Sequence, residues 1–379
     1  MAAMQMMPPS TRCVSSSDIS MTHAERLEAR ARDIARTLAA DRSTVAVFLI
    51  GSVARGEATA GSDLDLLVAR DGDRGEGETW RFTANDVMEN VHEISLDVLP
   101  SDLSERVLVE WYAHHVVADH LQGFRALYVD ADRADRLRPL WTVVRKRAEP
   151  QMQAGVARAY AARAASLAEA ATVARAYAPL DAHQILRLAS QRLLEASLIR
   201  LGWTIRGSKR RPEIAECFRA DTIVAQTLDL VESVVGLRGL TADVARYLAS
   251  LRLRLRKLLV SQLQLLCRSH PRCTPLAESV ARHNAAATDY HSALIATGFH
   301  RGAINHMRAL AGFHTIPSVV LRAIDAPSHT IDAYMQHDGI DRALRCAWME
   351  IAQLGGPSLD TWSQHLISIA NTIQERPAA

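Results

Sequence analysis

The chain contains 379 residues, of which 48% are hydrophobic and 23% charged, and its 44 Lys and Arg residues nearly balance 42 Asp and Glu residues. This composition excludes a disordered chain, and a net charge of +2 argues against a dedicated nucleic-acid binder. No apolar run reaches the roughly 18 residues that cross a bilayer, so we expect no membrane partner. The N-terminus lacks a secretion signal and the five cysteines are scattered, which favours the cytoplasm.

The N-terminal region begins with a stretch, residues 1–20, that we expect to be a disordered tail. After it, Thr22 and Glu25 have the spacing of a capping box and predict the start of a helix. The β-branched apolar run 44–50 predicts a buried strand, and the run 64–69 predicts a second one. The pattern so far is that of a small domain with both helix and sheet.

The next elements are predicted from composition and alternation. The Gly- and charge-rich stretch 70–78 is typical of a loop. Residues 92–99 alternate between apolar and polar side chains and predict a third strand. A helix is expected to open near Ser101, and a last short strand is expected at 127–129.

From about Asp132 the pattern is almost entirely helical. The strongest helical segments are 153–178, 183–201 and 242–266. We therefore predict an α+β protein, with a small mixed-sheet domain at residues 21–130 followed by a large all-α domain at residues 131–379. We expect the helical domain to bind an acceptor or to form a dimer.

One segment, FLIGSVARGEATAGSDLDLLVA, carries chemical information. Because strand side chains alternate, Asp63 and Asp65 should point to the same face, and two carboxylates that close repel one another unless a cation lies between them. Oxygen ligands of this kind suit Mg²⁺. Gly51 allows close approach of a ligand to the backbone, and Ser52 offers a hydroxyl at a turn that can bind phosphate. The alternative, a solvated Asp pair at a strand edge, leaves the preceding Gly-Ser unexplained.

The stretch IGSVARGEATAGSDLDLLV resembles the signature of the DNA polymerase β-type nucleotidyltransferase superfamily. The resemblance is greatest to minimal nucleotidyltransferases and aminoglycoside adenylyltransferases, covers about residues 45–68 and extends weakly to Leu99. It implies transfer of a nucleoside monophosphate from a nucleoside triphosphate with two Mg²⁺ ions. The positions implied are Asp63 and Asp65 as catalytic metal ligands, and Gly51, Ser52, Arg55 and Ser62 as nucleotide-binding residues.

The resemblance also implies a third acid on a neighbouring strand. Asp97 fits because apolar residues flank it on both sides, and Glu93 is the rival. Asp97 is expected to ligate the catalytic metal, to deprotonate the acceptor, or to do both.

The helical domain holds two further candidates for contact with the triphosphate. In aminoglycoside adenylyltransferases a similar helix carries an Arg and is followed by a loop with a Lys, which suggests Arg192 and Lys209 here. The alternative for Arg192 is an ion pair with Glu195, one turn away. The alternative for Lys209 is a solvated basic loop.

Three functional hypotheses follow. The first is an enzyme that moves AMP from ATP onto a hydroxyl or amine of a small-molecule acceptor. The second is a nucleotidyltransferase that acts on a macromolecule, by protein AMPylation or on tRNA, and the near-neutral charge argues against tRNA. The third is a non-catalytic, antitoxin-like binding partner. Many members of the family form dimers, so the resemblance is compatible with a homodimer.

Overall fold

The computed structural model describes residues 22–58, 62–72, 76–82, 88–100, 102, 104–114, 123–146, 149–203, 211–269, 291–310, 328–354 and 359–375, with isolated positions between 274 and 326. The chain divides into two compact units at three points: after Val98, after Gln122 and after Ala134. The first unit contains the sheet and the second is helical, so the predicted α+β class is confirmed. The predicted tail, residues 1–20, lies outside the described residues.

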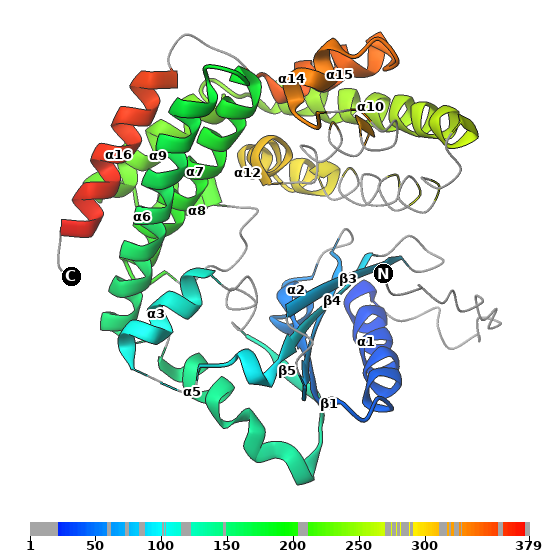
Figure 1. The fold of residues 1–379 in the computed structure, drawn as a ribbon, viewed down its shortest axis with the longest axis vertical. Coiled ribbons are helices and arrows are strands. Elements are labelled where there is room, and N and C mark those ends of the chain that lie inside the picture. Colours follow the sequence, from blue (N-terminus) through cyan, green and yellow to red (C-terminus); the bar gives the residue numbers. More distant parts are fainter. Residues whose placement is uncertain are drawn as a thin grey trace. The chain divides into compact units, whose positions relative to one another are not determined.

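The sheet of the first unit contains five strands in the order β3-β4-β2-β1-β5 (Figure 1). The strands are β1 (Thr44–Ile50), β2 (Leu64–Arg70), β3 (Glu76–Phe82), β4 (Met88–Ser95) and β5 (Arg125–Val129). β2 and β4 run parallel, and the other neighbouring pairs are antiparallel. Because β1 and β2 are apolar and central, every residue of β1 is buried, as is every residue of β2 except Asp65.

Helix α1 (His23–Ala39) covers one face of this sheet (Figure 1). It begins with the predicted capping box, in which Thr22 and Glu25 satisfy each other's backbone N–H groups. Its buried stripe of Leu27, Ala31 and Ile34 packs against alternate side chains of the central strands. Helix α1 and the central strands therefore share one apolar core.

The helical unit is built around an antiparallel pair, α6 (Pro150–Ala174) and α7 (Pro179–Ile199), with α16 (Leu359–Glu375) packed on α6. Alanines at positions 157, 161, 164, 168 and 171 follow the helical period along α6 and are buried, which allows neighbouring helices to approach closely. The remaining elements described are α3 (Glu105–His114), α5 (Arg138–Lys146), α8 (Arg211–Cys217), α9 (Thr222–Val235), α10 (Ala242–Ser269), α12 (His300–Asn305), the π-helical turn η6 (His306–Leu310), α14 (Ile331–Gln336) and α15 (Arg342–Ala352).

The first compact unit is interrupted by residues 99–122 and continues to Ala134, whereas the expected domain runs without a break from 21 to 130. Helix α3 belongs to the helical unit and packs on α6, where Gly155 makes room for Val109. The first unit resumes at Gly123, and the 3₁₀ helix η3 (Ala131–Leu137) leads out of it. No helix in the described part of the chain is long and apolar enough to cross a membrane.

Two of the predicted elements are wrong in part. The stretch 70–78 is not a loop throughout, because β3 begins at Glu76 and pairs with β4. The third strand spans 88–95 rather than 92–99, and the residues after it form a short 3₁₀ helix, η2 (Leu96–Val98). The strand β4 begins and ends where it pairs with β2, and the local sequence does not show which strands pair.

Candidate active site

Two predicted carboxylates meet where β1 ends and β2 begins. β1 and β2 are antiparallel with Ile50 opposite Asp65, so the turn after β1 lies beside the start of β2. Asp63 directly precedes β2 and Asp65 is its second residue. Both carboxylates accept hydrogen bonds from the same side chain, the amide of Asn90. The two carboxylates therefore lie on the same face of the sheet, as the alternation of strand side chains predicts.

Gly51 is fitted against the Asp65 carboxylate. Its φ of +71° lies in the left-handed region, which disfavours any residue with a Cβ. A Cβ at this position would overlap Oδ2 of Asp65 and would lie 3.0 Å from its Cγ. The glycine is therefore required both by the turn and by the carboxylate packed on it.

Asn90 is the side chain that joins the two carboxylates, and the sequence analysis did not find it. β4 runs parallel to β2 with Asn90 directly opposite Asp65. Its Nδ2 donates to Oδ1 of Asp65 at 2.9 Å and to Oδ2 of Asp63 at 3.3 Å. Only the register of two strands that are distant in sequence places this amide here, so a search for acids alone could not identify it.

The neighbour of Asn90, Glu89, points to the other face of β4 because strand side chains alternate. It is buried, and its carboxylate accepts a hydrogen bond from Nε of Arg30 on α1 at 2.6 Å. Glu89 is therefore engaged in fastening α1 to the sheet. It does not join Asp63 and Asp65.

Asp97, the expected third acid, is not brought to this pair. It lies in η2, after β4 has ended at Ser95, and Ser95 is opposite Arg70, the last residue of β2. The five residues from Asp65 to Arg70 span about 16 Å of strand. The prediction that Asp97 faces the pair from a neighbouring strand is therefore wrong, because β4 begins and ends four residues earlier than expected.

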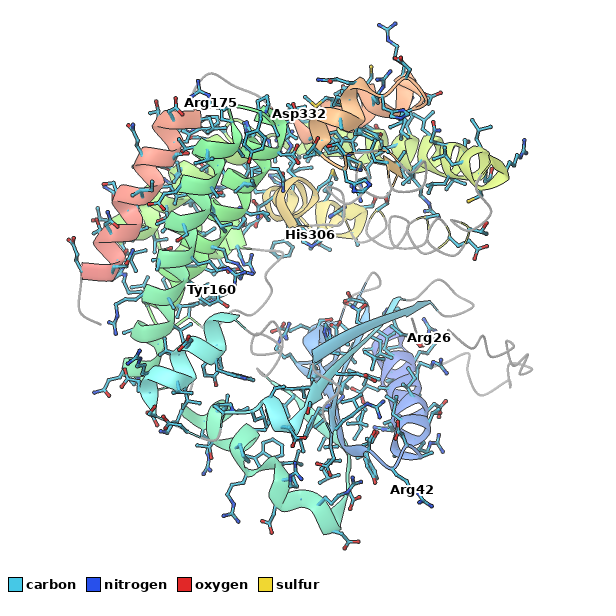
Figure 2. All side chains as sticks on the ribbon, in the orientation of Figure 1. Arg26, Arg42, Tyr160, Arg175, His306 and Asp332 are labelled. Atoms are coloured by element: carbon cyan, nitrogen blue, oxygen red, sulfur yellow. The ribbon has the colours of Figure 1, made fainter. Side chains whose placement is uncertain are left out.

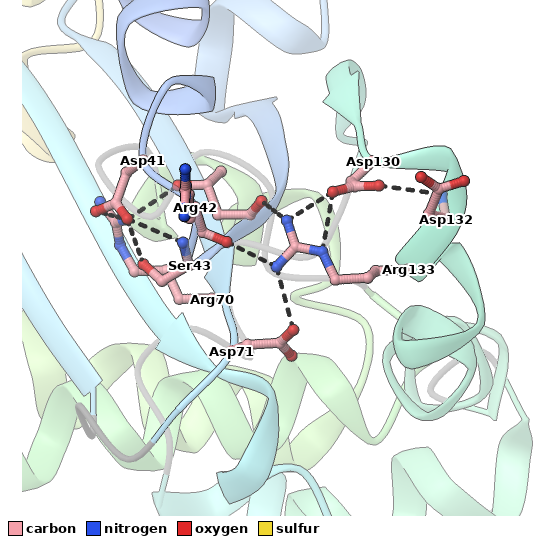
Figure 3. A network of polar contacts seen from close by, with 9 residues as sticks. Asp41, Arg42, Ser43, Arg70, Asp71, Asp130, Asp132 and Arg133 are labelled. Carbon is pink, nitrogen blue, oxygen red and sulfur yellow. Dashed lines mark hydrogen bonds and ion pairs between the residues drawn. The ribbon is translucent and has the colours of Figure 1, made fainter.

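The rival acid, Glu93, also belongs to the far end of the strands. Its carboxylate accepts a hydrogen bond from Nη2 of Arg70 at 2.9 Å, and Arg70 also binds Asp41 at 2.8 Å. Figure 3 shows the part of this network around Asp41 and Arg70, together with the neighbouring Arg133. Arg133 donates to the carbonyl of Thr44. These contacts pin the ends of β1 and β2 together.

The other predicted residues of the first unit lie along the turn. Ser52 is part of the short helix α2 (Gly51–Ala54), and Ser62 is buried next to Asp63. Nε of Arg55 donates to Glu57 at 2.9 Å, so its guanidinium is engaged in an ion pair. Arg55 also lies against Gly123, where a Cβ would overlap its side chain.

In the helical unit, Arg192 forms an ion pair with Glu195, which was the alternative to a contact with the triphosphate. Its Nη1 donates to Glu195 at 2.7 Å, and its guanidinium lies 5.3 Å from the ring centre of Tyr160, which Figure 2 labels on α6. Glu195 is buried and is also paired with Arg211. Lys209 lies outside the described residues.

The donors gathered at the start of β2 suit a hard cation. Carboxylate and amide oxygens are the ligands that Mg²⁺ and Ca²⁺ prefer. In the described ranges, no group of three or more His, Cys, Asp and Glu side chains could hold a metal ion. A cation at this edge would therefore have to use the two carboxylates together with other oxygen ligands.

Comparison with known proteins agrees with this chemistry. A family model described as "Nucleotidyltransferase domain" matches residues 30–122, which include β1, the Gly-Ser turn and β2. The match confirms the resemblance to the polymerase β-type superfamily and an enzyme of the EC 2.7.7 type that uses a nucleoside triphosphate. No curated protein matches the chain by sequence.

Proposed function

Because residues 30–122 form a nucleotidyltransferase domain, we propose that the chain transfers AMP from ATP to a hydroxyl or amine of a small-molecule acceptor and releases pyrophosphate. The observation that carries the proposal is the convergence of Asp63 and Asp65 beside Gly51. Like charges are brought together at a cost, and a cation-binding role accounts for that cost.

The proposed roles of the residues follow from their chemistry. Asp63 and Asp65 hold the divalent cation, for which we propose two Mg²⁺ ions as in the family. Bound there, Mg²⁺ supplies charge neutralisation on the triphosphate and lowers the pKa of the acceptor. Gly51 leaves room for the Asp65 carboxylate, and the hydroxyl of Ser52 is placed in the same turn to contact a phosphate oxygen. The acceptor atom bonds to the α-phosphorus as the bond to pyrophosphate breaks.

The helical unit is proposed to supply the acceptor site. The near-neutral charge of the chain favours a small molecule over tRNA. Lys209 remains a proposed phosphate ligand, whereas the pairing of Arg192 with Glu195 supports a structural role for that arginine. The free thiols of Cys217, Cys267 and Cys346 support a place in the cytoplasm.

Thermal melting tests the proposal directly. ATP, GTP, CTP and UTP are each added with and without Mg²⁺ to the wild type, to the double variant D63N/D65N and to D33N. D33N is the matched control because Asp33 is an exposed acid on α1 that pairs only locally with Arg36. A ligand that binds the native state raises the melting temperature. We expect a Mg²⁺-dependent rise with ATP in the wild type and in D33N, and none in the double variant.

Two outcomes contradict the proposal. A rise of equal size in D63N/D65N would show that the carboxylates do not hold the metal-nucleotide complex. A rise with another nucleotide alone would overturn ATP as the donor. With the donor identified, release of pyrophosphate during an acceptor screen then reports the transfer itself.

A further inference from the structure

The charge of the chain is divided unevenly between its two compact units. The first unit contains 12 Lys and Arg residues against 18 Asp and Glu residues, a net charge of −6. The helical unit contains 32 Lys and Arg residues against 24 Asp and Glu residues, a net charge of +8. The near-neutral total therefore conceals a basic unit, and an asymmetry of this kind favours a polyanionic partner.

Helix α10 (Ala242–Ser269) carries most of this excess. Asp243, in its first turn, is its only acidic residue, and six Lys and Arg residues follow it. Exposed charges on a helix are commonly balanced by an opposite charge three or four residues away. On α10 only Arg246 has such a partner within the helix, Asp243. From position 244 to its end, α10 therefore contains cations and no acid.

The two sides of α10 differ in burial. The side that faces the core of the helical unit is apolar and buried, and it includes Leu248, Leu251, Leu255, Leu259 and Leu263. The opposite side carries exposed polar residues that recur every three or four positions, namely Ser250, Arg254, Lys257, Ser261, Gln264 and Arg268. This spacing matches the turn of an α-helix, so these six residues lie in one row along α10, which we call the basic row.

The three cations of the basic row are not neutralised by the chain. Among the residues that the structure describes, no carboxylate forms an ion pair with Arg254, Lys257 or Arg268. Exposed arginines elsewhere are paired, for example Arg36 with Asp33. Arg254 and Arg268 are 14 residues apart in sequence, which separates them by about 21 Å along the helix axis. The row therefore presents uncompensated positive charge along a rigid element.

The composition of the basic row distinguishes between the polyanions that could bind it. Binding to an anionic membrane needs an apolar face beside the charges, whereas the apolar side of α10 is buried and its exposed Leu253 and Leu265 are about 18 Å apart along the axis. A protein partner needs aromatic or aliphatic anchors at the centre of the interface, and the row contains none. Hydroxyl and amide groups interspersed with cations are the groups that contact phosphate and sugar, so the row fits a nucleic acid.

We propose that the basic row binds the phosphate backbone of a nucleic acid, with Arg254, Lys257 and Arg268 each neutralising one phosphate. This inference is independent of the proposed function, because it concerns a docking surface and leaves the small-molecule acceptor as proposed. Phosphate contacts carry no sequence information, so binding should not depend on base sequence. Neutralised phosphates release counterions, so three contacts predict that log K falls against log salt with a slope of about −2.7 for a duplex.

Fluorescence anisotropy with a labelled DNA duplex of mixed sequence, at several salt concentrations, tests the inference without any turnover. R254Q/K257Q/R268Q removes the three cations and keeps polar side chains at the surface. R36Q/R42Q/R342Q is the matched control, because it removes the same charge from exposed arginines outside α10. R254K/R268K keeps the charge of the row. Melting without ligand checks that each variant is folded, and K257Q alone replaces the triple variant if that one does not fold.

We expect the wild type to lose about 40-fold in affinity for the duplex between 50 and 200 mM salt. R254Q/K257Q/R268Q should bind about tenfold or more weakly at 50 mM salt and should lose the salt slope, and K257Q alone should reduce the slope by about 0.9. The control and R254K/R268K should keep both affinity and slope. D63N/D65N should bind the duplex as the wild type does, because its substitutions lie in the other unit.

Several outcomes overturn the inference. One is a wild-type protein that does not bind the duplex at 50 mM salt, and another is a row variant that keeps wild-type affinity and slope. A loss in the control as large as that in the row variant would show that total charge, and not α10, is responsible. Binding of the wild type to vesicles of phosphatidylserine and phosphatidylcholine, with none to the duplex, would assign the row to a membrane instead.

Discussion

The two ends of strand β2 place their charged side chains in different surroundings. At its last residue, the guanidinium of Arg70 is surrounded by Asp41, Glu93 and two hydroxyl groups, so charge is balanced within the chain. At its start, Asp63 and Asp65 converge on the neutral amide of Asn90. A balanced network contributes to stability, whereas converging carboxylates fit a role in binding a cation. Stability and function are therefore assigned to opposite ends of one strand.

The largest effect is expected from Asp63→Asn, which tests the functional end. Removing one carboxylate halves the negative charge that we propose holds the cation. We expect nucleotidyl transfer, measured by pyrophosphate release, to fall by about 100- to 1000-fold, the range seen when a single preorganised charge-stabilising group is lost. Melting in the absence of ligand should show that the variant is folded. Activity within tenfold of the wild type would refute the role of Asp63.

Arg70→Leu tests the structural end. The Arg70 side chain is 6% exposed, and its loss leaves two carboxylates without the guanidinium. We expect a loss of about 3 kcal/mol in the free energy of unfolding, measured in urea. Arg36→Leu is the control, because its exposed pair with Asp33 should contribute less than about 1 kcal/mol. Nucleotide binding by folded R70L should match that of the wild type, and its loss would contradict the separation of the two ends.

A pair of glycine variants sharpens the comparison further. Gly51 and Gly56 have nearly equal φ values, +71° and +72°, but a Cβ at Gly56 meets nothing within 4 Å whereas one at Gly51 overlaps Asp65. Gly56→Ala should cost about 1–2 kcal/mol of unfolding free energy for the left-handed backbone alone. Gly51→Ala should cost about 1–3 kcal/mol more for the overlap and should also lose Mn²⁺ binding. Equal costs in the two variants would mean that Gly51 does not position Asp65.

The smallest expected change in stability concerns a second pair of carboxylates, Asp181 and Asp332, in the helical unit. Asp181 accepts the N–H of Ile331 at 2.9 Å, and Asp332, labelled in Figure 2, accepts the N–H of Leu180 at 3.1 Å. Burial raises the pKa of Asp181 to about 6, and the neighbouring Asp332 adds to this rise. This pair can therefore relieve its repulsion by binding a proton, with no need for a cation.

The pH dependence follows from that raised pKa. Between pH 4 and 6 the folded state binds more protons than the unfolded state, so the free energy of unfolding falls as pH rises through this window. Asp181→Asn should remove this fall and should be more stable than the wild type at pH 8 by about 1 kcal/mol, a value reduced for the partial exposure of the group. Urea unfolding at pH 4.5 and 8 checks this, and equal pH dependence in both proteins would contradict it.

Local sequence patterns predicted the elements that depend on local chemistry. The capping box of α1, the apolar strand β1, and the face shared by Asp63 and Asp65 all follow from neighbouring residues. β3 was missed because its sequence, EGETWRF, is charged and begins around a glycine, a composition that suits an edge strand but also a loop.

The predictions that failed are those that depend on pairing between distant strands. Because Leu96 and Val98 are apolar, the local pattern predicted that Asp97 lies in a strand. The pairing of β4 with β2 ends at Ser95, and Asp97 lies in the 3₁₀ helix that follows. The same register brings Asn90 opposite Asp65. A one-residue slip in register reverses every side chain of a strand, so the partners of a site cannot be predicted until the pairing is known.

One titration tests the central claim most directly: binding of Mn²⁺ to D65N and to D97N, each compared with the wild type in the presence of ATP. The two substitutions are chemically identical, and the two aspartates lie at opposite ends of the paired strands. We predict that D65N loses Mn²⁺ binding and that D97N keeps the affinity of the wild type. Loss of binding in D97N with retention in D65N would contradict the account and move the site to the other end of the sheet.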